Sequence, residues 1–535
     1  MRDRVTDRWM AASRLRYDRG DAWLALIIFS ATVLYISWLP RNLSPADESV
    51  YLYEAKRILE GQVLYRDIFE IITPGWMYLM ALLFRIFGTD LATARIAMAV
   101  MHGVGGVVIY LTCRRLGIRR GWCWPAALAY LVISQPAWPI ASQHWLTTLI
   151  CVVLLLVCAG RQPARAAWPL LPGLVIGVLI GVQQQRGSIM AVGTFTWLVV
   201  DHALQRRYRP SPPAAPLVTQ LSLLVAGALI VVLPLCAGMI ASAGFQNVWR
   251  ALVIHPIFNY GGTTHCEWGH INVMTAPQGS YTFPRLLKYL PLVLIVSLLR
   301  LVVQWVRRQG QQEVRTLTLL ILYCLFSMLS IAYFPDFIHI AFIAPAFFVA
   351  IAENLEWTLR LIPAPPKLLR AGGWLLAAGL LAASGLRLHR NMTRAYATYR
   401  FTLQTAFGRV DVADARETQL YEKIAELMET VPSRELFCYP IVSHLYLMAD
   451  ADNPTRYQFF WPGYNSPDQV QEVLDTLKAK NLPYILALPA FLSRSDPIMD
   501  YIRSNYEPLT DAGEIGKGIF RRKDLGVPPP LGKAD

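Results

Sequence analysis

Charged residues are scarce in this chain of 535 residues. Asp, Glu, Lys and Arg together make up 16% of the sequence, whereas hydrophobic residues make up 55%. A typical soluble domain contains about 25% charged residues, and a soluble chain of this length would need a more polar surface. The composition therefore excludes an ordinary soluble protein and predicts an integral membrane protein.

The sequence also lacks the marks of a disulfide scaffold and of a nucleotide enzyme. It has only eight cysteines, and six of them lie in or beside apolar segments, where they act as small packing residues. Their spacing shows no disulfide framework. No glycine-rich phosphate loop follows a strand-like segment, so the sequence does not support a nucleotide site.

Acidic residues are fewer than basic ones, 36 against 50, which gives a formal net charge of +14. The basic residues do not form one block, as a nucleic-acid-binding surface would require. They lie in short loops between apolar segments, which is the positive-inside pattern of cytoplasmic loops, so we expect no nucleic-acid partner. These loops contain Arg114, Arg115, Arg119 and Arg120; Arg161 and Arg165; Arg206, Arg207 and Arg209; Arg307, Arg308 and Arg315; and Arg360, Lys367 and Arg370.

Long apolar segments recur along the first three quarters of the chain. The first follows six arginines between Arg2 and Arg19 and lacks a small-residue cleavage site, so we expect it to remain as an anchor. Residues 74–88 are short, begin at Pro74 and contain Arg85, so we expect them to lie in the membrane interface. The segments expected to cross about 30 Å of hydrocarbon are 22–39, 92–113, 121–136, 142–159, 168–183, 186–204, 217–241, 284–306, 315–333, 337–355 and 370–388.

These crossings predict a fold that is mainly α, a polytopic membrane helix bundle of about 11–13 spans. After residue 390 helical patterns at 418–429 and 468–480 alternate with strand-like runs at 435–439, 484–488 and 518–521. Eleven crossings place this C-terminal α/β domain outside the cytoplasm. The expected parts are a cytoplasmic N-terminal segment 1–21, a transmembrane module 22–389 with a first outer loop 40–91, an extracytoplasmic α/β domain 390–526, and a flexible tail 527–535.

The first outer loop carries an acidic pair, Asp47 and Glu48, directly after the first apolar segment. One interpretation is catalytic, because a carboxylate at the membrane surface can act as a base toward a substrate with an apolar tail. The other is structural: Ser44 and Pro45 form a helix start, and an acid at position 47 suits a capping box. Local sequence leaves both interpretations open.

Four arginines are candidates for binding a phosphate, because the guanidinium group matches phosphate geometry. The alternative for each is a contact with lipid headgroups, reached by extending the side chain to the membrane surface. Arg95 and Arg186 lie at the ends of apolar segments on the predicted outer side and are the stronger pair. The four are Arg57, Arg66, Arg95 and Arg186.

Three more polar residues fall on the predicted outer side. Asp336 and His339 are three residues apart, so they share a face if a helix begins there, and ionisable residues entering a span indicate function. His144 opens another span at the same level. His265, Glu267 and His270 have a metal-like spacing, but they do not form a HExxH motif, so we predict no metal site.

Several segments resemble the GT-C class of integral membrane glycosyltransferases, in the bacterial branch near the protein O-mannosyltransferases and the lipid A aminoarabinose transferase. The resemblance spans nearly the whole chain and is most specific in the 44–95 block. It rests on PADESVYLYEAKRILEG at 45–61, YRDIFEIITPGWMYLMALLFRIFG at 65–88, QQQRG at 183–187 and YFPDFIHIAF at 333–342.

The resemblance implies a sugar donor carried on polyprenyl phosphate and used on the outer face of a bacterial inner membrane. It implies that Asp47 is the catalytic base or the carboxylate that orients the acceptor, with Glu48 as a second candidate. Relatives often have a lysine before the Pro-Pro or Pro-Gly pair to hold the donor phosphate, whereas Thr73 stands there in this chain. The positive charge must then come from Arg66, Arg95 or Arg186.

We therefore predict a hexosyl- or pentosyltransferase that moves a sugar from a polyprenyl-phosphate donor to an envelope lipid, glycan or protein, among membrane lipids. The chemistry requires no cofactor, and a divalent metal is compatible with it but not demanded. Two alternatives remain: a transporter or lipid flippase, which charged residues near the middle of spans would favour, and a non-catalytic envelope scaffold that binds partners through residues 390–535.

Overall fold

The structure is a computed structural model. It describes residues 17–45, 47–160, 166–208, 215–259, 266–271, 282–307, 310–361, 366–461, 463–488, 496–509 and 518–525. The predicted tail at 527–535 and most of the N-terminal segment lie outside these residues. The chain forms two compact units. We call the first, Met1–Leu39, Ile96–Ala237 and His265–Ala395, the helical unit, and the second, Pro40–Arg95, Gly238–Thr264 and Tyr396–Asp535, the mixed unit.

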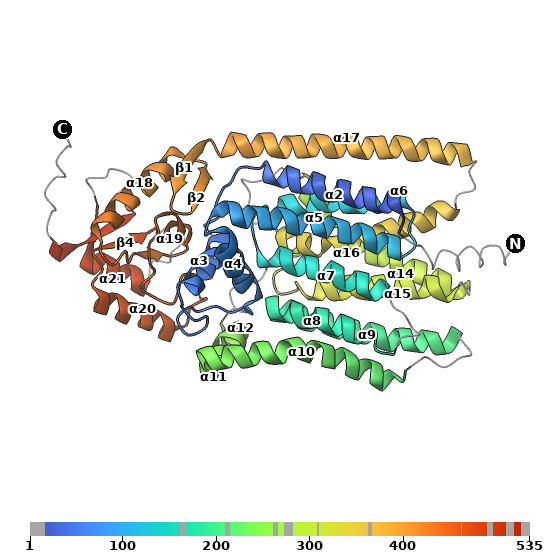
Figure 1. Cartoon of the computed structure of the whole chain (residues 1–535), viewed down its shortest axis with the longest axis horizontal. Coiled ribbons are helices and arrows are strands. Elements are labelled where there is room, and N and C mark those ends of the chain that lie inside the picture. The colour runs from blue at the N-terminus through green and yellow to red at the C-terminus, as the bar shows by residue number, and fades with distance from the viewer. Residues whose placement is uncertain are drawn as a thin grey trace. The chain divides into compact units, whose positions relative to one another are not determined.

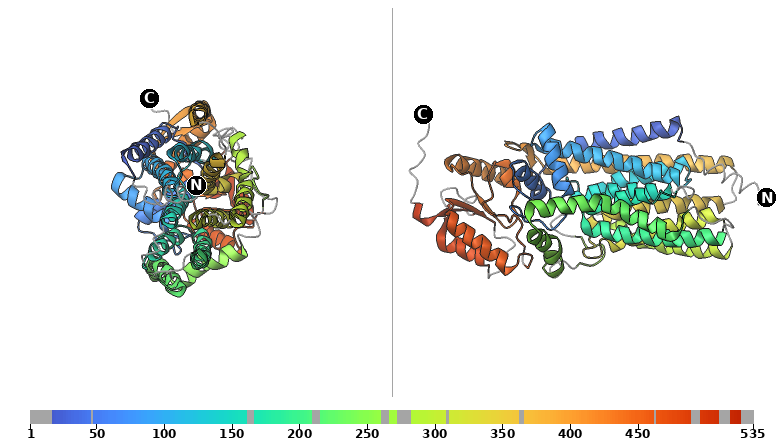
Figure 2. Two further views of the ribbon diagram at one scale, coloured as in Figure 1. Left: turned by 90° about the vertical axis from the view of Figure 1, so that its right-hand side faces the viewer. Right: turned by 60° about the horizontal axis from the view of Figure 1, so that its bottom comes forward.

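The helical unit consists of antiparallel helices that lie side by side along their length (Figures 1 and 2). Within the described residues, eight helices are long and apolar enough to cross a membrane, so the protein is a multi-pass membrane protein. Every predicted crossing segment overlaps a helix. The helices are α2 (Arg19–Ser37), α5 (Leu91–Arg115), α6 (Arg120–Ala129), α7 (Gln143–Ala159), α8 (Leu170–Val182), α9 (Gln184–Tyr208), α10 (Leu217–Ala243), α13 (Thr282–Leu287), α14 (Leu290–Val306), α15 (Gln311–Leu329), α16 (Phe337–Leu361) and α17 (Pro366–Thr398).

Glycines let α8 and α10 pack closely. A Cβ atom added at Gly173 would lie 2.2 Å from the carbonyl oxygen of Leu224, and one added at Gly177 would lie 2.7 Å from that of Ala228. Both distances are too short for a real Cβ atom, so the two backbones can lie this close only because glycine has no side chain. Small residues are common between membrane helices for this reason. A larger residue at either position would force α8 and α10 apart.

The two ends of the helical unit differ in charge. The helices alternate in direction, so the C-terminal ends of α5, α9, α14 and α16 meet the N-terminal ends of α2, α6 and α15 (Figure 1). The described arginines next to these helix ends, among them Arg114, Arg120, Arg206 and Arg360, therefore lie at this one end. Their clustering agrees with the positive-inside interpretation of the sequence.

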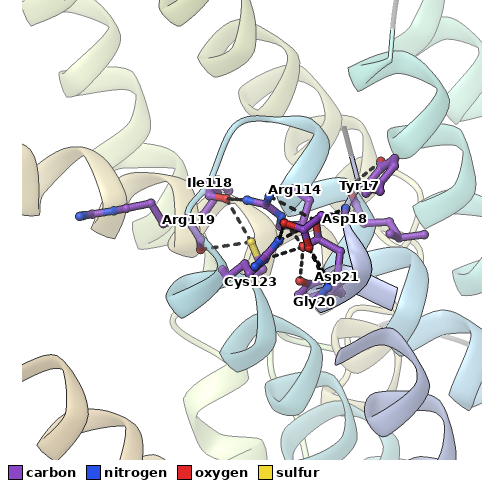
Figure 3. A network of polar contacts seen from close by, with 11 residues as sticks. Tyr17, Asp18, Gly20, Asp21, Arg114, Ile118, Arg119 and Cys123 are labelled. Carbon is purple, nitrogen blue, oxygen red and sulfur yellow. Dashed lines mark hydrogen bonds and ion pairs between the residues drawn. The ribbon is translucent and has the colours of Figure 1, made fainter. Parts of the chain in front are cut away.

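Asp21 is the centre of a polar network at this arginine-rich end (Figure 3). Its side chain is 1% exposed and accepts hydrogen bonds from Tyr110 Oη at 2.6 Å, Arg114 Nε at 2.8 Å and Arg120 Nε at 2.9 Å. Asp18 caps the N-terminus of α2 and also pairs with Arg120. The network joins the start of α2 to the end of α5 and the start of α6.

Other buried carboxylates at this end also pair with arginines. Asp201 of α9 pairs with Arg315 of α15. Glu356 of α16 accepts a hydrogen bond from Arg119 Nε at 2.9 Å and from Arg360 Nη2 at 2.9 Å. Arg119 extends away from the Asp21 network, as Figure 3 shows. Arg119 and Arg315 therefore join helices through ion pairs, as Arg114 and Arg120 do.

The mixed unit contains a four-stranded sheet with the order β3-β4-β6-β5, in which only β3 and β4 are parallel. A separate hairpin pairs β1 with β2. The sheet core includes Phe437, Val473, Ile485, Ile502 and Tyr506. The elements are α3 (Asp47–Leu59), α4 (Gly75–Phe87), α11 (Phe245–Trp249), α12 (His255–Phe258), β1 (Phe401–Thr405), β2 (Gly408–Val412), α18 (Ala415–Thr430), β3 (Phe437–Tyr439), α19 (His444–Met448), α20 (Pro467–Lys480), β4 (Tyr484–Ala487), α21 (Pro497–Asn505), β5 (Tyr506–Pro508) and β6 (Ile519–Arg522).

The predicted α/β pattern is confirmed in the mixed unit. The helices α18 and α20 and the strands β3, β4 and β6 occupy the predicted segments, whereas the hairpin β1–β2, the strand β5 and the helix α21 were not predicted. The segment predicted to lie in the interface forms α4, whose 13 residues extend only about 20 Å, less than the hydrocarbon thickness. It packs against α3.

Candidate functional site

The start of α3 is fixed by Glu48, which is fully buried. Its Oε2 accepts the backbone N–H of Ser44 at 3.1 Å and Nη2 of Arg95 at 2.9 Å, while its Oε1 lies 2.8 Å from Nη1 of Arg95. Arg95 also donates to the carbonyl oxygen of Asn42. Two of the predicted site residues are therefore joined to each other, in a pair that ties the start of α3 to the start of α5.

Asp47 is the first residue of α3 and is partly exposed. It shares a helix face with Tyr51 and Glu54, because residues four and seven positions later lie on the same side of a helix. Burial raises the pKa of Tyr51 well above its usual value, and the negative charges of Glu70, Asp47 and Glu54 raise it further. Asp47 therefore lies at one end of an acidic face.

Arg57 lies at the other end of α3 and is buried. Its Nε donates to Gln62 Oε1 at 2.6 Å, and its Nη2 donates to the carbonyl oxygens of Asp67 at 3.0 Å and Thr455 at 3.2 Å. Its guanidinium also lies 5.7 Å from the ring centre of Tyr53. Arg57 thereby joins α3 to the loop after it and to the segment before α20.

Arg66 is exposed and separate from the other predicted residues. Its guanidinium pairs with the carboxylate of Asp67, with Nε–Oδ1 at 3.0 Å and Nη2–Oδ2 at 2.8 Å, and this contact lowers the pKa of Asp67. A surface pair between neighbouring residues contributes little to stability and leaves the arginine in water.

A polar cavity of about 510 Å³ opens beside Arg57. Its walls carry charges of both signs and amide and hydroxyl groups rather than aromatic rings, so it differs from an apolar lipid pocket. It is lined by Arg57, Gln62, Asp67, Ser433, Glu435, Asp452, Asn453, Pro454, Thr455, Arg456 and Lys480.

In the helical unit, Arg186 enters a buried polar cluster at the start of α9. Its Nη1 donates to Thr147 Oγ1 at 2.8 Å and Thr148 Oγ1 at 3.3 Å, and its Nη2 donates to the carbonyl oxygen of Phe342 at 2.9 Å. These hydrogen bonds, and a longer one to the carbonyl oxygen of His144 at 3.5 Å, end on neutral oxygens, and within the described residues its Nε has no hydrogen-bond partner. Among the described residues, no carboxylate accepts a hydrogen bond from Arg186.

Three other predicted residues surround the same cluster. Asp336 precedes α16, and its Oδ1 accepts the backbone N–H of His339 at 2.8 Å and contacts the Nδ1 of the same ring at 2.7 Å. The His144 ring stacks on Phe342 with centroids 4.7 Å apart and meets the His339 ring edge-on at 5.2 Å. The helical unit thus brings together Arg186, His144, Asp336 and His339, three of which are hydrogen-bond donors suited to an anion.

Among the described residues, no group of three or more His, Cys, Asp or Glu side chains is arranged to hold a metal ion. His265 lies outside the described residues, so its position relative to Glu267 and His270 is not described. All eight cysteines are free thiols.

The sequence analysis did not single out several residues of the polar cluster around Arg186 and of the acidic face of α3. Thr147 and Thr148 lie three and four positions after His144, a spacing that places them on its helix face. Glu54, on the acidic face of α3, and Glu70 are also buried, and both lie in segments that carry the resemblance, although neither was singled out. The position of Glu54, seven residues after Asp47, was the available signal.

Comparison with solved structures shows what this arrangement resembles. The crystal structure of ArnT from Cupriavidus metallidurans bound to undecaprenyl phosphate superposes with a TM-score of 0.52 at 15% identity, covering 87% of this chain and 93% of that one. The apo structure of the same protein gives 0.53 at 14% identity, covering 88% and 94%. The chain has the fold of ArnT. No protein-family model matches the sequence, and a search of curated proteins finds no match.

The ArnT likeness covers both units of this chain, because 87% coverage exceeds either one alone. It agrees with the GT-C resemblance read from the sequence. At this identity a shared fold does not carry over individual residue roles.

Proposed function

We propose that this protein is a membrane glycosyltransferase that moves a sugar from a polyprenyl-phosphate donor to an envelope lipid, glycan or protein acceptor. The observation that carries the proposal is the likeness to ArnT over most of both chains, one of whose structures holds undecaprenyl phosphate. Nucleotide sugars are absent outside the cytoplasm, so the reaction uses the outer face of the inner membrane, with the C-terminal α/β domain on that side.

Asp47 is the proposed base. It is partly exposed at the start of α3, whereas Glu48 is fully buried with its oxygens held by Ser44 and Arg95. Glu48 and Arg95 then serve to place the helix that carries Asp47. A positioned carboxylate that takes the proton of an acceptor hydroxyl contributes about 10²–10⁴-fold to the rate.

Arg186 is the proposed cation for the donor phosphate. The leaving group is a phosphate, which needs positive charge rather than a proton donor. Thr73 replaces the lysine expected from the resemblance, Arg66 pairs with Asp67, and Arg95 pairs with Glu48. Arg186 is buried and its hydrogen bonds within the described residues end on neutral oxygens, which supports its selection.

The direct test is sugar transfer in liposomes that contain the purified protein and a set of polyprenyl-phosphate-linked hexoses and pentoses. Transfer by the wild-type protein supports the proposal, and Asp47→Asn is expected to lower kcat about 10²–10⁴-fold with an unchanged melting temperature. Wild-type rates in Asp47→Asn would remove Asp47 from the mechanism. Transport of the intact lipid or solute without transfer of a sugar would favour a transporter instead.

A further inference from the structure

The polar cavity of about 510 Å³ beside Arg57 lies within the mixed unit and has no part in the transfer chemistry proposed above. Its described walls come from the end of α3 with the loop that follows it, from residues 433–435 before β3, and from residues 452–456 between α19 and α20. Lys480, the last residue of α20, completes the lining. Cavities of about 300–1,000 Å³ accommodate ligands of drug-like size, so this one is large enough for a short oligosaccharide.

Hydrogen bonds hold these walls in place. The backbone N–H of Asp452 donates to the carbonyl oxygen of Arg434 at 2.9 Å, which fixes the second wall against the third. Arg57 Nη2 donates to the carbonyl oxygens of Asp67 at 3.0 Å and Thr455 at 3.2 Å, which joins the first wall to the third. A cavity whose walls are fixed in this way keeps its shape without a ligand, and this lowers the entropic cost of binding.

Most of the charged side chains around the cavity are already in ion pairs, so together they offer a ligand no net charge. The pairs are Lys480 with Glu435, Arg456 with Glu472, and Asp67 with Arg66.

The two remaining charges of the described lining are opposite in sign, and both have unused hydrogen-bonding capacity. Arg57 is buried; its Nη1 has no hydrogen-bond partner among the described residues, and its other nitrogens donate to Gln62 Oε1 and to backbone carbonyls. Within the same part of the chain, no hydrogen bond or ion pair ends on the Asp452 carboxylate. A ligand in the cavity would therefore find an acceptor at Asp452 and a cationic donor at Arg57.

These groups favour an uncharged ligand with hydroxyl groups. A hydroxyl both donates and accepts, so one ligand can donate to Asp452 and accept from Arg57. The carboxylate of Asp452 would repel a phosphate, and Arg57 would repel a cation. Among the described lining residues only Pro454 lacks a polar side chain, so the cavity offers no apolar surface to a lipid tail. A carbohydrate satisfies all of these conditions.

The cavity lies at the end of α3 opposite to Asp47. Arg57 follows Asp47 by ten positions, which corresponds to about 15 Å along the helix axis. A ligand in the cavity therefore reaches Asp47 only if it extends over this distance, as a chain of sugars does. Binding energy from a remote part of a substrate holds its reacting group in position, so a site at this distance is useful to a transferase.

We propose that the cavity beside Arg57 binds an uncharged oligosaccharide and thereby holds the acceptor of the transfer reaction. The role as acceptor site rests on the proposed function, whereas the binding of the oligosaccharide does not. Among envelope lipids, glycans and proteins, this site selects a glycan chain as the acceptor.

Two substitutions test the cavity without changing α3. Asp452→Ala removes the acceptor for ligand hydroxyls, and Ser433→Trp places a large ring at the cavity from an exposed position. The matched controls are Asp475→Ala and Ser504→Trp, which change exposed residues of the mixed unit outside the lining. Melting temperatures check that each variant folds, and if one cavity variant is unfolded the other decides.

Binding is measured by isothermal titration of the purified full-length protein with neutral oligosaccharides of glucan, mannan, galactan, arabinan and xylan. At least one is expected to bind, and both cavity variants should weaken its binding roughly 10- to 100-fold, the effect of losing a hydrogen bond to a charged group, while the controls retain it. No binding by the wild-type protein, or wild-type affinity in both cavity variants, would overturn the proposal. Binding of inorganic phosphate or of the zwitterion diglycine in place of the oligosaccharides would overturn the choice of a carbohydrate.

The acceptor role is measured by sugar transfer to the oligosaccharide that binds, in the liposomes described above. The cavity variants should raise the KM for the acceptor roughly 10- to 100-fold at an unchanged kcat, whereas Asp47→Asn lowers kcat. An unchanged KM in variants that have lost binding would overturn the acceptor role. If the wild-type protein transfers no sugar to any acceptor, the proposed function fails, and the titration alone decides whether the cavity binds a glycan.

Discussion

The two ends of the helical unit treat buried arginines in opposite ways. At one end Arg114 is 7% exposed and donates to the carboxylate of Asp21, and Arg315, whose side chain is largely buried, pairs with Asp201. The exposed Arg119 pairs there with the buried Glu356. At the other end Arg186 is 3% exposed and donates to threonine hydroxyls and backbone carbonyls.

The difference indicates what each arginine does. A buried ion pair that is neutral overall joins helices but has no charge left for a ligand. A buried guanidinium without a counter-charge is costly to desolvate, and it is retained where an anion completes the site. We therefore interpret the Asp21 end as structural, while the proposed function assigns the charge of Arg186 to the donor phosphate.

The largest effect is expected from breaking the Asp21 network. Asp21→Asn leaves the guanidinium of Arg114 buried without a carboxylate, and removing one partner of a buried pair destabilises by about 3–5 kcal/mol. Thermal unfolding in detergent measures this loss. Asp18→Asn, which touches the same Arg120 from an exposed position, is the matched control and should change the melting temperature much less. If Asp21→Asn and Asp18→Asn lowered the melting temperature equally, burial of Asp21 would not be the reason that this network stabilises the protein.

The next-largest effect is expected at Arg186, at the opposite end of the helical unit, where within the described residues no carboxylate accepts a hydrogen bond from the guanidinium. Thr147→Asp places a carboxylate where a hydroxyl now lies 2.8 Å from Arg186, so it should neutralise the guanidinium and compete with a phosphate. Donor affinity is expected to fall roughly 10- to 100-fold, the value of one or two charge-assisted contacts at about 1.5–3 kcal/mol.

Thr147→Asn is the control for that experiment, because it has a similar size and no charge. It should retain most of the donor affinity, while Arg186→Ala should lose as much as Thr147→Asp. Unchanged donor binding in both Thr147→Asp and Arg186→Ala would show that the phosphate is held elsewhere.

A smaller effect should sharpen the comparison with the mixed unit, where burial raises the pKa of the Glu54 carboxyl group. The folded state raises the pKa of Glu54 above its unfolded value of about 4.5. Its contribution to stability is therefore complete below that pH and is lost as the pH rises through the folded pKa. Melting temperatures from pH 5 to pH 9, in steps of about one unit, should fall more for the wild-type protein than for Glu54→Gln. Parallel curves would contradict a protonated Glu54.

The smallest effect is expected at Arg66, which pairs with its neighbour Asp67 on the surface. Arg66→Ala should leave both the melting temperature and the donor affinity within measurement error, because water already screens this pair. A clear loss of donor affinity would return Arg66 to the set of phosphate-binding residues.

Much of the fold follows from local patterns. The span-length apolar segments each overlap a helix, and α18, α20, β3, β4 and β6 arise where periodicity predicted them. The hairpin β1–β2 escaped prediction because its five-residue strands carry no clear alternation, and its first strand is exposed at most positions. Its pairing depends on contacts that a local window does not contain.

The candidate site was predictable in part. The residue types near Asp47 and Arg186 are visible in the sequence, since ionisable groups beside apolar segments are rare. The sequence could not show that Glu48 would pair with Arg95, 47 positions away, or that Glu54 would meet Gln458. Such pairings depend on which helix faces approach one another.

The sequence by itself determined that the chain is a multi-pass membrane protein, because the solvation of apolar segments and of arginine-rich loops depends on composition alone. Only the tertiary structure decided which buried charges are neutralised. Arg114 meets a carboxylate, Arg186 meets neutral oxygens, and burial raises the pKa of Glu54. The reason is that the free energy of a buried charge is set by the few groups within several ångströms of it, and folding brings these groups from distant parts of the chain.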